Sequence, residues 1–282
     1  MPPTKTEIVG RKEMSMKSKV AALALVAGLT AVSACGADRT AQQTGGSNTS
    51  NEAIPQFAPE VAEQPAANYA PNIGPSNFVK EVDNPYFPLE PGTTWVYEGK
   101  TPEGTERVED SVLQETKRVM GVECVVLRDR VWLNGELIED TVDWHAQDKE
   151  GNVWYFGEYT KEYENGKVVS TEGSFEAGEK GALPGIIMPA DPKVGDSYRQ
   201  EYYKGEAEDM AEVISLNGSA LNDAVTTPYD SFNKVVLVTK DWNPLEPDIL
   251  EHKYYAPGIG LIGETKITGP SEKIELIDFK SG

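Results

Sequence analysis

Short runs in which apolar and polar residues alternate fill the chain from about Asn77 to Gly282. Clear examples are TWVYE at 94–98, VECVVLRDRVWL at 122–133 and VWYFGEYTKEY at 153–163. Alternation with a period of two residues is typical of β-strands that bury one face, and turn residues recur between the runs. The pattern predicts one all-β domain with about a dozen antiparallel strands.

Turn signals indicate how the strands follow one another. Asn134-Gly135 and Asn165-Gly166 each stand between alternating runs, which is the sequence signal of a two-residue hairpin. We expect further turns at 120–121 and 149–152, whereas KGEAEDMAEVISL at 204–216 fits a short helix as well as a strand. Strands joined by successive hairpins predict a single antiparallel meander.

A flat sheet with so many strands would expose long edges and would curl. The meander is therefore expected to form a strongly curved sheet, a barrel or a half-barrel. Its core should take the inward halves of the strands, with much of the buried area supplied by aromatic side chains, namely Trp95, Trp132, Trp144, Trp154 and Tyr254.

The N-terminal part of the chain has a different pattern. Residues 20–34 carry no charge and follow Lys17 and Lys19, and the run is shorter than the roughly 20 apolar residues that span a bilayer. A basic start, a short apolar stretch and small residues at its end are typical of a secretory signal peptide. The four residues from Val32 to Cys35, where this stretch ends, resemble the lipobox of bacterial lipoproteins.

The lipobox implies that the signal peptide, residues 1–34, is removed and that Cys35 carries a lipid on its sulfur and an acyl chain such as palmitate on its amine. Two or more acyl chains anchor a protein stably. A signal peptide with an unrelated cysteine near its cleavage site is the alternative. Translation is expected to begin at Met16 or Met14, because MKSK at 16–19 has the form of a normal signal-peptide start. Gly36 would permit sorting to the outer membrane in a Gram-negative bacterium.

Residues 35–76 are rich in Ala, Gln, Asn, Pro, Ser and Gly and contain few large apolar side chains. Such a segment cannot bury enough surface to offset the entropy lost on ordering. We expect a disordered tether that holds a globular domain, residues 77–282, away from the membrane. The lipid anchor places the protein in the extracytoplasmic cell envelope.

Charge and cysteine content exclude several kinds of site. The chain has 26 basic and 46 acidic residues, a formal net charge of −20, which repels phosphate backbones and excludes nucleic-acid binding. With Cys35 lipidated, Cys124 is the other of two cysteines, so a disulfide framework or a CxxC metal site is not possible. Cys124 lies among apolar neighbours and is expected to be a small buried residue.

Two motifs resemble a known group of proteins. NPYFPLEPGTTWVYEG at 84–99 is similar to the opening of many β-rich bacterial lipoproteins, and SFNKVVLVTK at 231–240 with EHKYYAPGIGLIGE at 251–264 is similar to their closing strands. The resemblance covers nearly all of 84–264 and implies a β-rich fold and a surface location. It implies no activity, since none is established for the group. Lipoprotein-carrier half-barrels offer a weaker analogy, which rests on fold alone.

Candidate catalytic residues are few. His145 and His252 could act as bases near neutral pH, but each is expected on the polar face of a strand. No GxSxG sequence surrounds a serine, and a Ser–His–Asp triad could form only in space. No zinc pattern, glycine-rich phosphate loop, or haem or flavin motif is present. We therefore expect a non-enzymatic protein without a cofactor, with a hydrolase as the alternative.

Four acidic residues gather in GEAEDMAE at 205–212, namely Glu206, Glu208, Asp209 and Glu212. In a strand three of them would share a face, and in a helix Glu208 and Glu212 would pair. Several oxygen ligands suit Ca²⁺ better than a transition metal, although the spacing of a calcium-binding hand is absent. A solvated face is one interpretation, and a site with calcium as cofactor is the other.

The segment GALPGIIMPADP at 181–192 is expected to be a loop, yet it contains the apolar residues Leu183, Ile186, Ile187 and Met188. It is expected either to plug the open end of the curved sheet or to form a lid over an apolar cavity. Three later residues could line the same opening, namely Arg199, Tyr202 and Tyr203.

These features favour a lipid-anchored envelope lipoprotein that binds an apolar or amphiphilic ligand, such as a lipid, or that maintains the envelope. The alternative is a calcium-binding or hydrolytic surface protein that uses the acidic residues between Glu206 and Glu212.

Overall fold

The computed structural model describes residues 69–218, 225–232, 236–268 and 272–282. The signal peptide, Cys35 and the tether as far as residue 68 lie outside the described residues, so these expectations stay predictions. The described chain contains a short 3-10 helix, η2 (Pro75–Asn77), and it has no helix that is long and apolar enough to cross a bilayer.

Strands make up the rest of the regular structure in these residues. The first five are long: β1 (Thr94–Thr101), β2 (Gly104–Val119), β3 (Val122–Leu133), β4 (Glu136–Gln147) and β5 (Val153–Glu164). Shorter strands follow: β6 (Lys167–Ser170), β7 (Phe175–Glu176), β8 (Leu183–Met188), β9 (Ser197–Arg199), β10 (Glu201–Tyr202), β11 (Met210–Ser215), β12 (Val225–Thr226) and β13 (Ser231–Phe232). The last four are β14 (Leu237–Trp242), β15 (Leu250–Ala256), β16 (Gly260–Lys266) and β17 (Lys273–Lys280).

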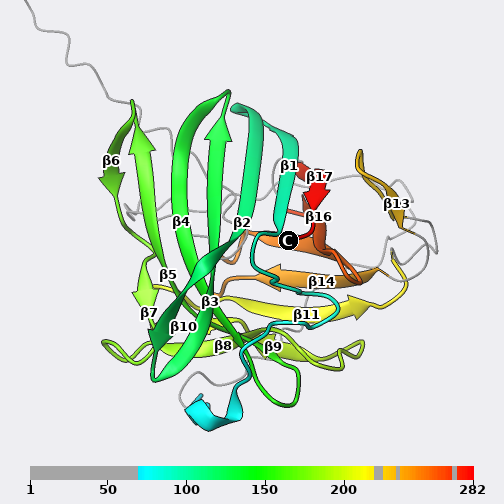
Figure 1. Cartoon of the computed structure of the whole chain (residues 1–282). Coiled ribbons are helices and arrows are strands. Elements are labelled where there is room, and N and C mark those ends of the chain that lie inside the picture. The colour runs from blue at the N-terminus through cyan, green and yellow to red at the C-terminus, as the bar shows by residue number, and fades with distance from the viewer. Residues whose placement is uncertain (1–68, 219–224, 233–235, 269–271) are drawn as a thin grey trace, which may run out of the picture.

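One antiparallel sheet contains all of these strands except β12 and β13. Its order is β10-β8-β5-β4-β3-β2-β1-β17-β16-β15-β14-β11-β9, with β6 and β7 paired to β5 beside this path. Two meanders, β1–β5 and β14–β17, therefore join where β1 pairs with β17. In Figure 1, β2–β5 run upright while β11 and β14 run across the view, so the sheet curls round on itself. The prediction of an all-β, strongly curved antiparallel sheet is confirmed, and we call this sheet the barrel.

The two ends of the strand order are adjacent in sequence. Gln200 links β9, which pairs with β11, to β10, which pairs with β8. The backbone N–H of Gln200 donates to the carbonyl oxygen of Asp209 at 2.8 Å, and its side-chain amide donates to Oδ2 of Asp241 at 3.1 Å. The chain itself thus joins the two edges of the sheet and nearly closes the barrel. We call this junction at Gln200 the seam.

Tyr69, the first of the described residues, contacts the barrel. Its hydroxyl donates to the carbonyl oxygen of Pro184 at 2.7 Å, and its ring packs edge-on against Tyr202 with centroids 5.9 Å apart. The sequence assigns residues 69–76 to the tether, and in the structure Tyr69 lies beside the seam.

Two apolar clusters stabilise the sheet. The larger lies inside the barrel and includes Tyr97, Val108 and Leu276. The smaller contains Cys124 and Val126, which alternate along β3 with residues of the first cluster and therefore lie on the outer face. Cys124 is fully buried and unpaired, as expected for a small core residue.

The expected aromatic core is found in part. Trp95 and Trp144 are buried, whereas Trp132, Trp154 and Tyr254 are half-buried. Trp132 and Trp154 each lie one residue from the end of their strand, and a period-two pattern does not distinguish such partial burial from full burial.

The predicted hairpins are confirmed. Asn134 and Gly135 join β3 to β4 with φ values of 51° and 86°, and Asn165 and Gly166 join β5 to β6 with φ values of 51° and 72°. Two successive residues with positive φ match the right-handed twist of the flanking strands. The ambiguous segment at 204–216 contains strand β11.

Replacing Asn134 with alanine should destabilise the protein more than replacing Asn165. Both variants place alanine at a positive φ, but Asn134 also accepts a hydrogen bond from the Thr105 N–H at 3.0 Å and donates one to the carbonyl oxygen of Glu103 at 3.1 Å. The loss of these bonds should lower the free energy of unfolding of Asn134→Ala by about 1 kcal/mol more than that of Asn165→Ala. Thermal unfolding of the two variants side by side measures the difference, and equal losses would contradict the bridging role of Asn134.

Candidate functional site

A cavity lies inside the barrel between its first five strands and the β15–β16 hairpin. Its empty volume is about 620 Å³ when the part that opens to solvent is included. The residues that line it are Phe87, Pro88, Leu89, Trp95, Tyr97, Asp110, Leu127, Asp129, Glu139, Thr141, Asp143, Glu158, Ile187, Tyr255, Gly260 and Leu261.

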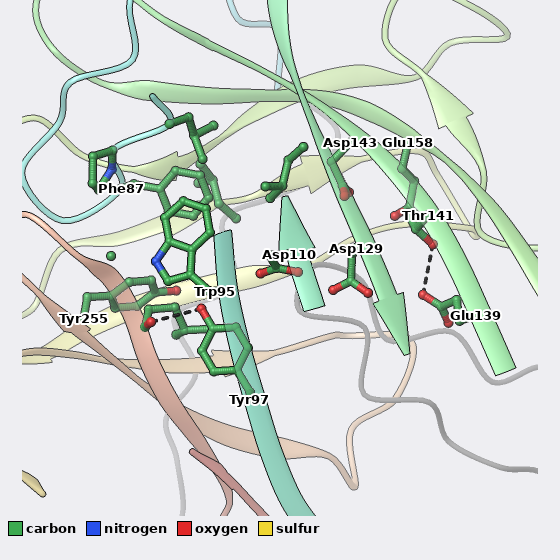
Figure 2. A pocket seen from close by; sticks show the side chains of 16 residues that line it. Phe87, Trp95, Tyr97, Asp110, Asp129, Glu139, Thr141, Asp143, Glu158 and Tyr255 are labelled. Carbon is green, nitrogen blue, oxygen red and sulfur yellow. Dashed lines mark hydrogen bonds between the residues drawn. The ribbon is translucent and has the colours of Figure 1, made fainter. Parts of the chain in front are cut away.

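Carboxyl groups gather on one side of this cavity (Figure 2). Asp110 on β2 lies directly opposite Asp129 on β3, and Asp143 on β4 lies directly opposite Glu158 on β5. Directly paired residues of antiparallel strands point to the same face of the sheet. Glu139, two pairs further along β4, points to the same side. The register of β2–β5 thus places five carboxyl groups inside the barrel.

These carboxyl groups have few hydrogen-bond donors. Oδ1 of Asp110 and both carboxyl oxygens of Asp129 have no partner in the described part of the chain, apart from a proton that the two groups could share. The residues are 3% and 4% exposed. A buried polar group without a partner costs about 1–3 kcal/mol, and a charged one costs more. The fold alone gives no reason to place them there.

Tyr155 lies between the second pair. Its hydroxyl oxygen is 2.8 Å from Oδ1 of Asp143 and 3.0 Å from Oε2 of Glu158. A phenol has one proton to donate. The hydroxyl proton is therefore shared between the two carboxyl groups, unless one of them carries a proton and donates to the phenol oxygen.

Burial controls the protonation of this side of the cavity. It raises the pKa of Asp110 and of Glu139 to about 7. Burial first, and then the charges of neighbouring carboxylates, raise the pKa of Asp129 and of Glu158 well above the usual range. Burial likewise raises the pKa of Asp143, in spite of the hydrogen bond from Tyr155. These shifts favour the protonated forms of the five carboxyl groups as long as no positive charge lies between them.

Aromatic and aliphatic side chains form the other side of the cavity (Figure 2). The indole N–H of Trp95 donates to the carbonyl oxygen of Ile259 at 2.7 Å, and the hydroxyl of Tyr97 donates to that of Leu261 at 3.0 Å. These bonds fix two rings of β1 against the β15–β16 turn, and Phe87 and Tyr255 lie beside them. The cavity is therefore amphipathic, with a rigid apolar side and an acidic side.

His145 lies behind the acidic side and not on the polar face of β4, so that expectation was wrong. It is fully buried, and its ring stacks on Tyr155 with centroids 5.0 Å apart. His145 shares the inward phase of β4 with Asp143 and pairs with Val125 of β3, whereas its apolar neighbour Trp144 belongs to the outer cluster. Burial lowers the pKa of His145 to about 3, so the ring is neutral near pH 7. His252 is half-buried on β15, and burial lowers its pKa as well.

The apolar segment at 181–192 does not form the loop that the sequence predicts. Leu183–Met188 is strand β8, which pairs with β5 on one side and with β10 on the other. Its apolar residues run together because neighbouring structure covers both faces of the strand, as in other buried strands. Ile187 lines the cavity and Met188 is fully buried, whereas Leu183 and Ile186 are half-buried.

Three other expected ligand residues lie near the seam. Arg199 is buried, with its guanidinium 4.8 Å from the centre of the Tyr202 ring and its Nη1 3.8 Å from Oε2 of Glu208. Tyr203 is half-buried, and its backbone pairs with Ala207. The structure brings Ile187 into the cavity but does not bring Arg199, Tyr202 or Tyr203 to its lining.

The four acidic residues between 206 and 212 are dispersed by the structure. Glu206 is exposed in a turn, Glu208 faces Arg199, and Glu212 forms an ion pair with Lys240 of β14. Asp209 points to Glu201, and burial raises its pKa to about 7. In the described part of the chain, no group of three or more His, Cys, Asp and Glu side chains is placed to hold a metal ion.

The interior carboxyl groups are functional candidates that the sequence analysis missed. A signal for them was present, because Val108, Asp110 and Val112 share one phase of the β2 alternation, and Leu127, Asp129 and Val131 share one phase of β3. An acidic residue in the apolar phase of a strand indicates an inward-pointing carboxyl group. The basic residues of these strands, such as Arg128 and Arg130, occupy the opposite phase.

Comparison with known proteins gives two solved structures of limited similarity. One is a protein of Bacteroides fragilis that is provisionally described as exported, with a YmcC-like fold. It is 17% identical, with 70% of this chain and 99% of that chain covered and a TM-score of 0.39. The other is provisionally described as a lipoprotein of Parabacteroides distasonis. It is 14% identical, with 69% and 98% covered and a TM-score of 0.36. No protein-family model matches this chain, and no curated protein matches it.

Proposed function

We propose that this chain is a non-enzymatic, lipid-anchored protein of the bacterial cell envelope that binds an amphiphilic ligand inside its barrel. The proposal rests on the structure of the cavity. Rings fixed by hydrogen bonds form its apolar side, and carboxyl groups without full sets of partners form its acidic side. An arrangement that is costly for the folded protein is typical of a binding site, where a ligand supplies the missing interactions.

A ligand retained in the cavity should be visible by native mass spectrometry of the full chain. We expect the protein, released from detergent micelles in the gas phase, to keep an additional small mass. Leu261→Phe adds volume at the cavity wall and should remove that mass, whereas Val169→Phe adds the same ring at an exposed position of β6 and should not. A bare mass in every preparation, together with no rise in unfolding temperature on addition of octyl glucoside, would refute a ligand-binding barrel.

Anchoring is tested separately by Cys35→Ser. A lipid can be attached only to the thiol, so this variant should lose the anchor and leave the membrane fraction, while the barrel keeps its unfolding temperature. Membrane fractionation followed by detection of the protein measures the change. Firm retention of Cys35→Ser in the membrane would contradict the lipobox interpretation, whatever the result for the cavity.

A further inference from the structure

In the described residues, some buried carboxyl groups of the barrel lie close to a positively charged side chain, and others do not. In the half formed by β14–β16, Lys253 supplies a positive charge, with its Nζ 3.7 Å from Oδ2 of Asp241 and 3.8 Å from Oε2 of Glu264. In the half formed by β2–β5, the carboxyl groups that line the cavity have no such partner, since no Lys or Arg belongs to the cavity lining in the described residues. Buried charges are ordinarily paired.

The carboxyl oxygens that lack a hydrogen-bond partner face the cavity. Figure 2 shows the carboxyl groups of Asp110 and Asp129 side by side, with Asp143 and Glu158 further along the same side, and all four residues line the cavity. Both oxygens of Asp129 lack a partner other than the neighbouring carboxyl group, and the residue is 4% exposed. A positive group that entered the cavity would find acceptors on its acidic side without displacing any salt bridge of the protein.

An organic cation fits this arrangement better than a metal ion. The described residues contain no group of three or more side chains placed to hold a metal. The opposite side of the cavity presents Phe87, Trp95, Tyr97 and Tyr255, and aromatic faces attract ammonium groups and pack against apolar chains. Substituted ammonium ions have the hydrogen-bond donors that carboxylates accept, and their organic part suits the rings.

We propose that the cavity binds an organic ammonium ion, whose charged nitrogen lies between the Asp110–Asp129 and Asp143–Glu158 pairs and whose apolar part contacts Trp95 and Tyr97. This proposal rests on the proposed function, because it names the chemical class of the ligand for the same cavity. It goes further in assigning the charge of the ligand and a role to each side of the site.

Binding of the cation is coupled to the release of protons. Carboxyl groups that hold protons in the empty cavity lose them to solvent when a positive charge arrives, so about one proton leaves for each ammonium ion bound. Asp110, with a pKa of about 7, is the carboxyl group most readily ionised in this way. Several titratable or charged groups face these carboxyl groups from neighbouring elements. They are Tyr97, Glu106, Glu109, His145, Tyr155, Glu162, Glu201, Asp241, Lys253 and Tyr255, in addition to Asp110, Asp129, Glu139, Asp143 and Glu158 themselves.

Calorimetric titration of the full chain in phospholipid nanodiscs tests this inference, with empty nanodiscs as the blank. The probes are octylammonium chloride, octyl glucoside and sodium octyl sulfate, which share one chain and differ in the charge of the head group. We expect octylammonium to bind at least tenfold more tightly than octyl glucoside at pH 7. Titrations in two buffers with different heats of ionisation should show about one proton released per octylammonium and none per octyl glucoside.

Matched variants assign the effect to the cavity. Asp129→Asn and Asp143→Asn, each checked by thermal unfolding, should lose about tenfold in octylammonium affinity and keep their affinity for octyl glucoside. Glu115→Gln removes the same charge from an exposed position of β2 and should behave as the wild type.

Three outcomes would overturn the inference. Equal affinity for octylammonium and octyl glucoside would show that the charge of the head group does not affect binding. Tightest binding of octyl sulfate would show that the cavity prefers a negative charge. Either result leaves the proposed binding function standing. The absence of binding by all three probes would refute the inference and the proposed function together.

Discussion

Gly185→Val should unfold about 6–12 °C below the wild type, because it forces apart the seam that closes the barrel. A Cβ atom on Gly185 would lie 2.3 Å from both the carbonyl carbon and the oxygen of Gln200, and 2.5 Å from the carbonyl oxygen of Arg199. These atoms belong to the backbone, which joins β9 to β10 and cannot rotate away as a side chain would. Overpacking of this kind costs about 3 kcal/mol or more, and valine adds two further methyl groups.

Thermal unfolding of the full chain, followed by tryptophan fluorescence, measures this effect. Gly74→Ala is the matched control, since a Cβ atom there has no neighbour within 4 Å and should change the free energy of unfolding by less than about 0.5 kcal/mol. If Gly185→Val unfolded within about 2 °C of the wild type, the close approach of β8 to Gln200 would not be what joins the two edges of the sheet.

Local signals in the sequence predicted the strands and the antiparallel meander order, which holds within β1–β5 and within β14–β17, but not the contact that joins these two parts. The alternation of VECVVLRDRVWL and the Asn-Gly turns at 134–135 and 165–166 report on neighbours along the chain, and both were correct. The pairing of Thr94 with Lys280, which joins the two meanders, links residues from opposite ends of the domain. No turn residue marks such a contact, because it depends on how the whole sheet curls.

The wrong predictions for the segment at 183–188 and for His145 also have their causes in tertiary structure. Leu183–Met188 has the prolines and glycines of a loop, yet pairing with both β5 and β10 makes it a strand, so tertiary contacts outweigh local preference. His145 lies in the same inward phase of β4 as Asp143, and its apolar neighbour Trp144 lies on the covered outer face, so the apolar residues of this segment do not identify the inner face of the strand.

The residues of the candidate site were harder to predict from the sequence than the fold was. The acidic residues of the segment at 205–212 were a candidate calcium site because they are close together in sequence, but the structure separates them. The carboxyl groups of the cavity lie on four different strands and meet only through the register of β2–β5. Asp129 lies between Leu127 and Val131 in an otherwise apolar phase, whereas Glu139 and Asp143 share a largely polar phase of β4. Only the convergence of these groups gives them chemical significance.

The same carboxyl groups should make the protein less stable as the pH rises from 6.5 to 8.5. Burial raises the pKa of Asp110 and Glu139 to about 7 and that of Asp129 well above its usual range. Outside the cavity lining, burial also raises to about 8 the pKa of Glu106, which lies in the same phase of β2 as Asp110. In the unfolded chain all of these groups are ionised above about pH 5. A carboxyl group with a raised pKa contributes stability that is fully present below its unfolded pKa and is lost as the pH rises through its folded pKa. His145 has the opposite sign, but its contribution lies below about pH 6.5, outside this range.

Each proton that the folded barrel holds and the unfolded chain does not changes the free energy of unfolding by about 1.4 kcal/mol per pH unit. One such proton, retained across the two units, therefore lowers the free energy of unfolding by about 2.7 kcal/mol. Urea denaturation at a series of pH values measures the slope. Asp129→Asn cannot ionise, so it should be more stable than the wild type at pH 8.5 and should show a shallower slope, while Glu115→Gln should keep the wild-type slope. A wild-type protein whose stability is flat or rises over this range would show that the cavity carboxyl groups are already ionised and paired, and would remove the physical basis for a site that exchanges its protons for a cation.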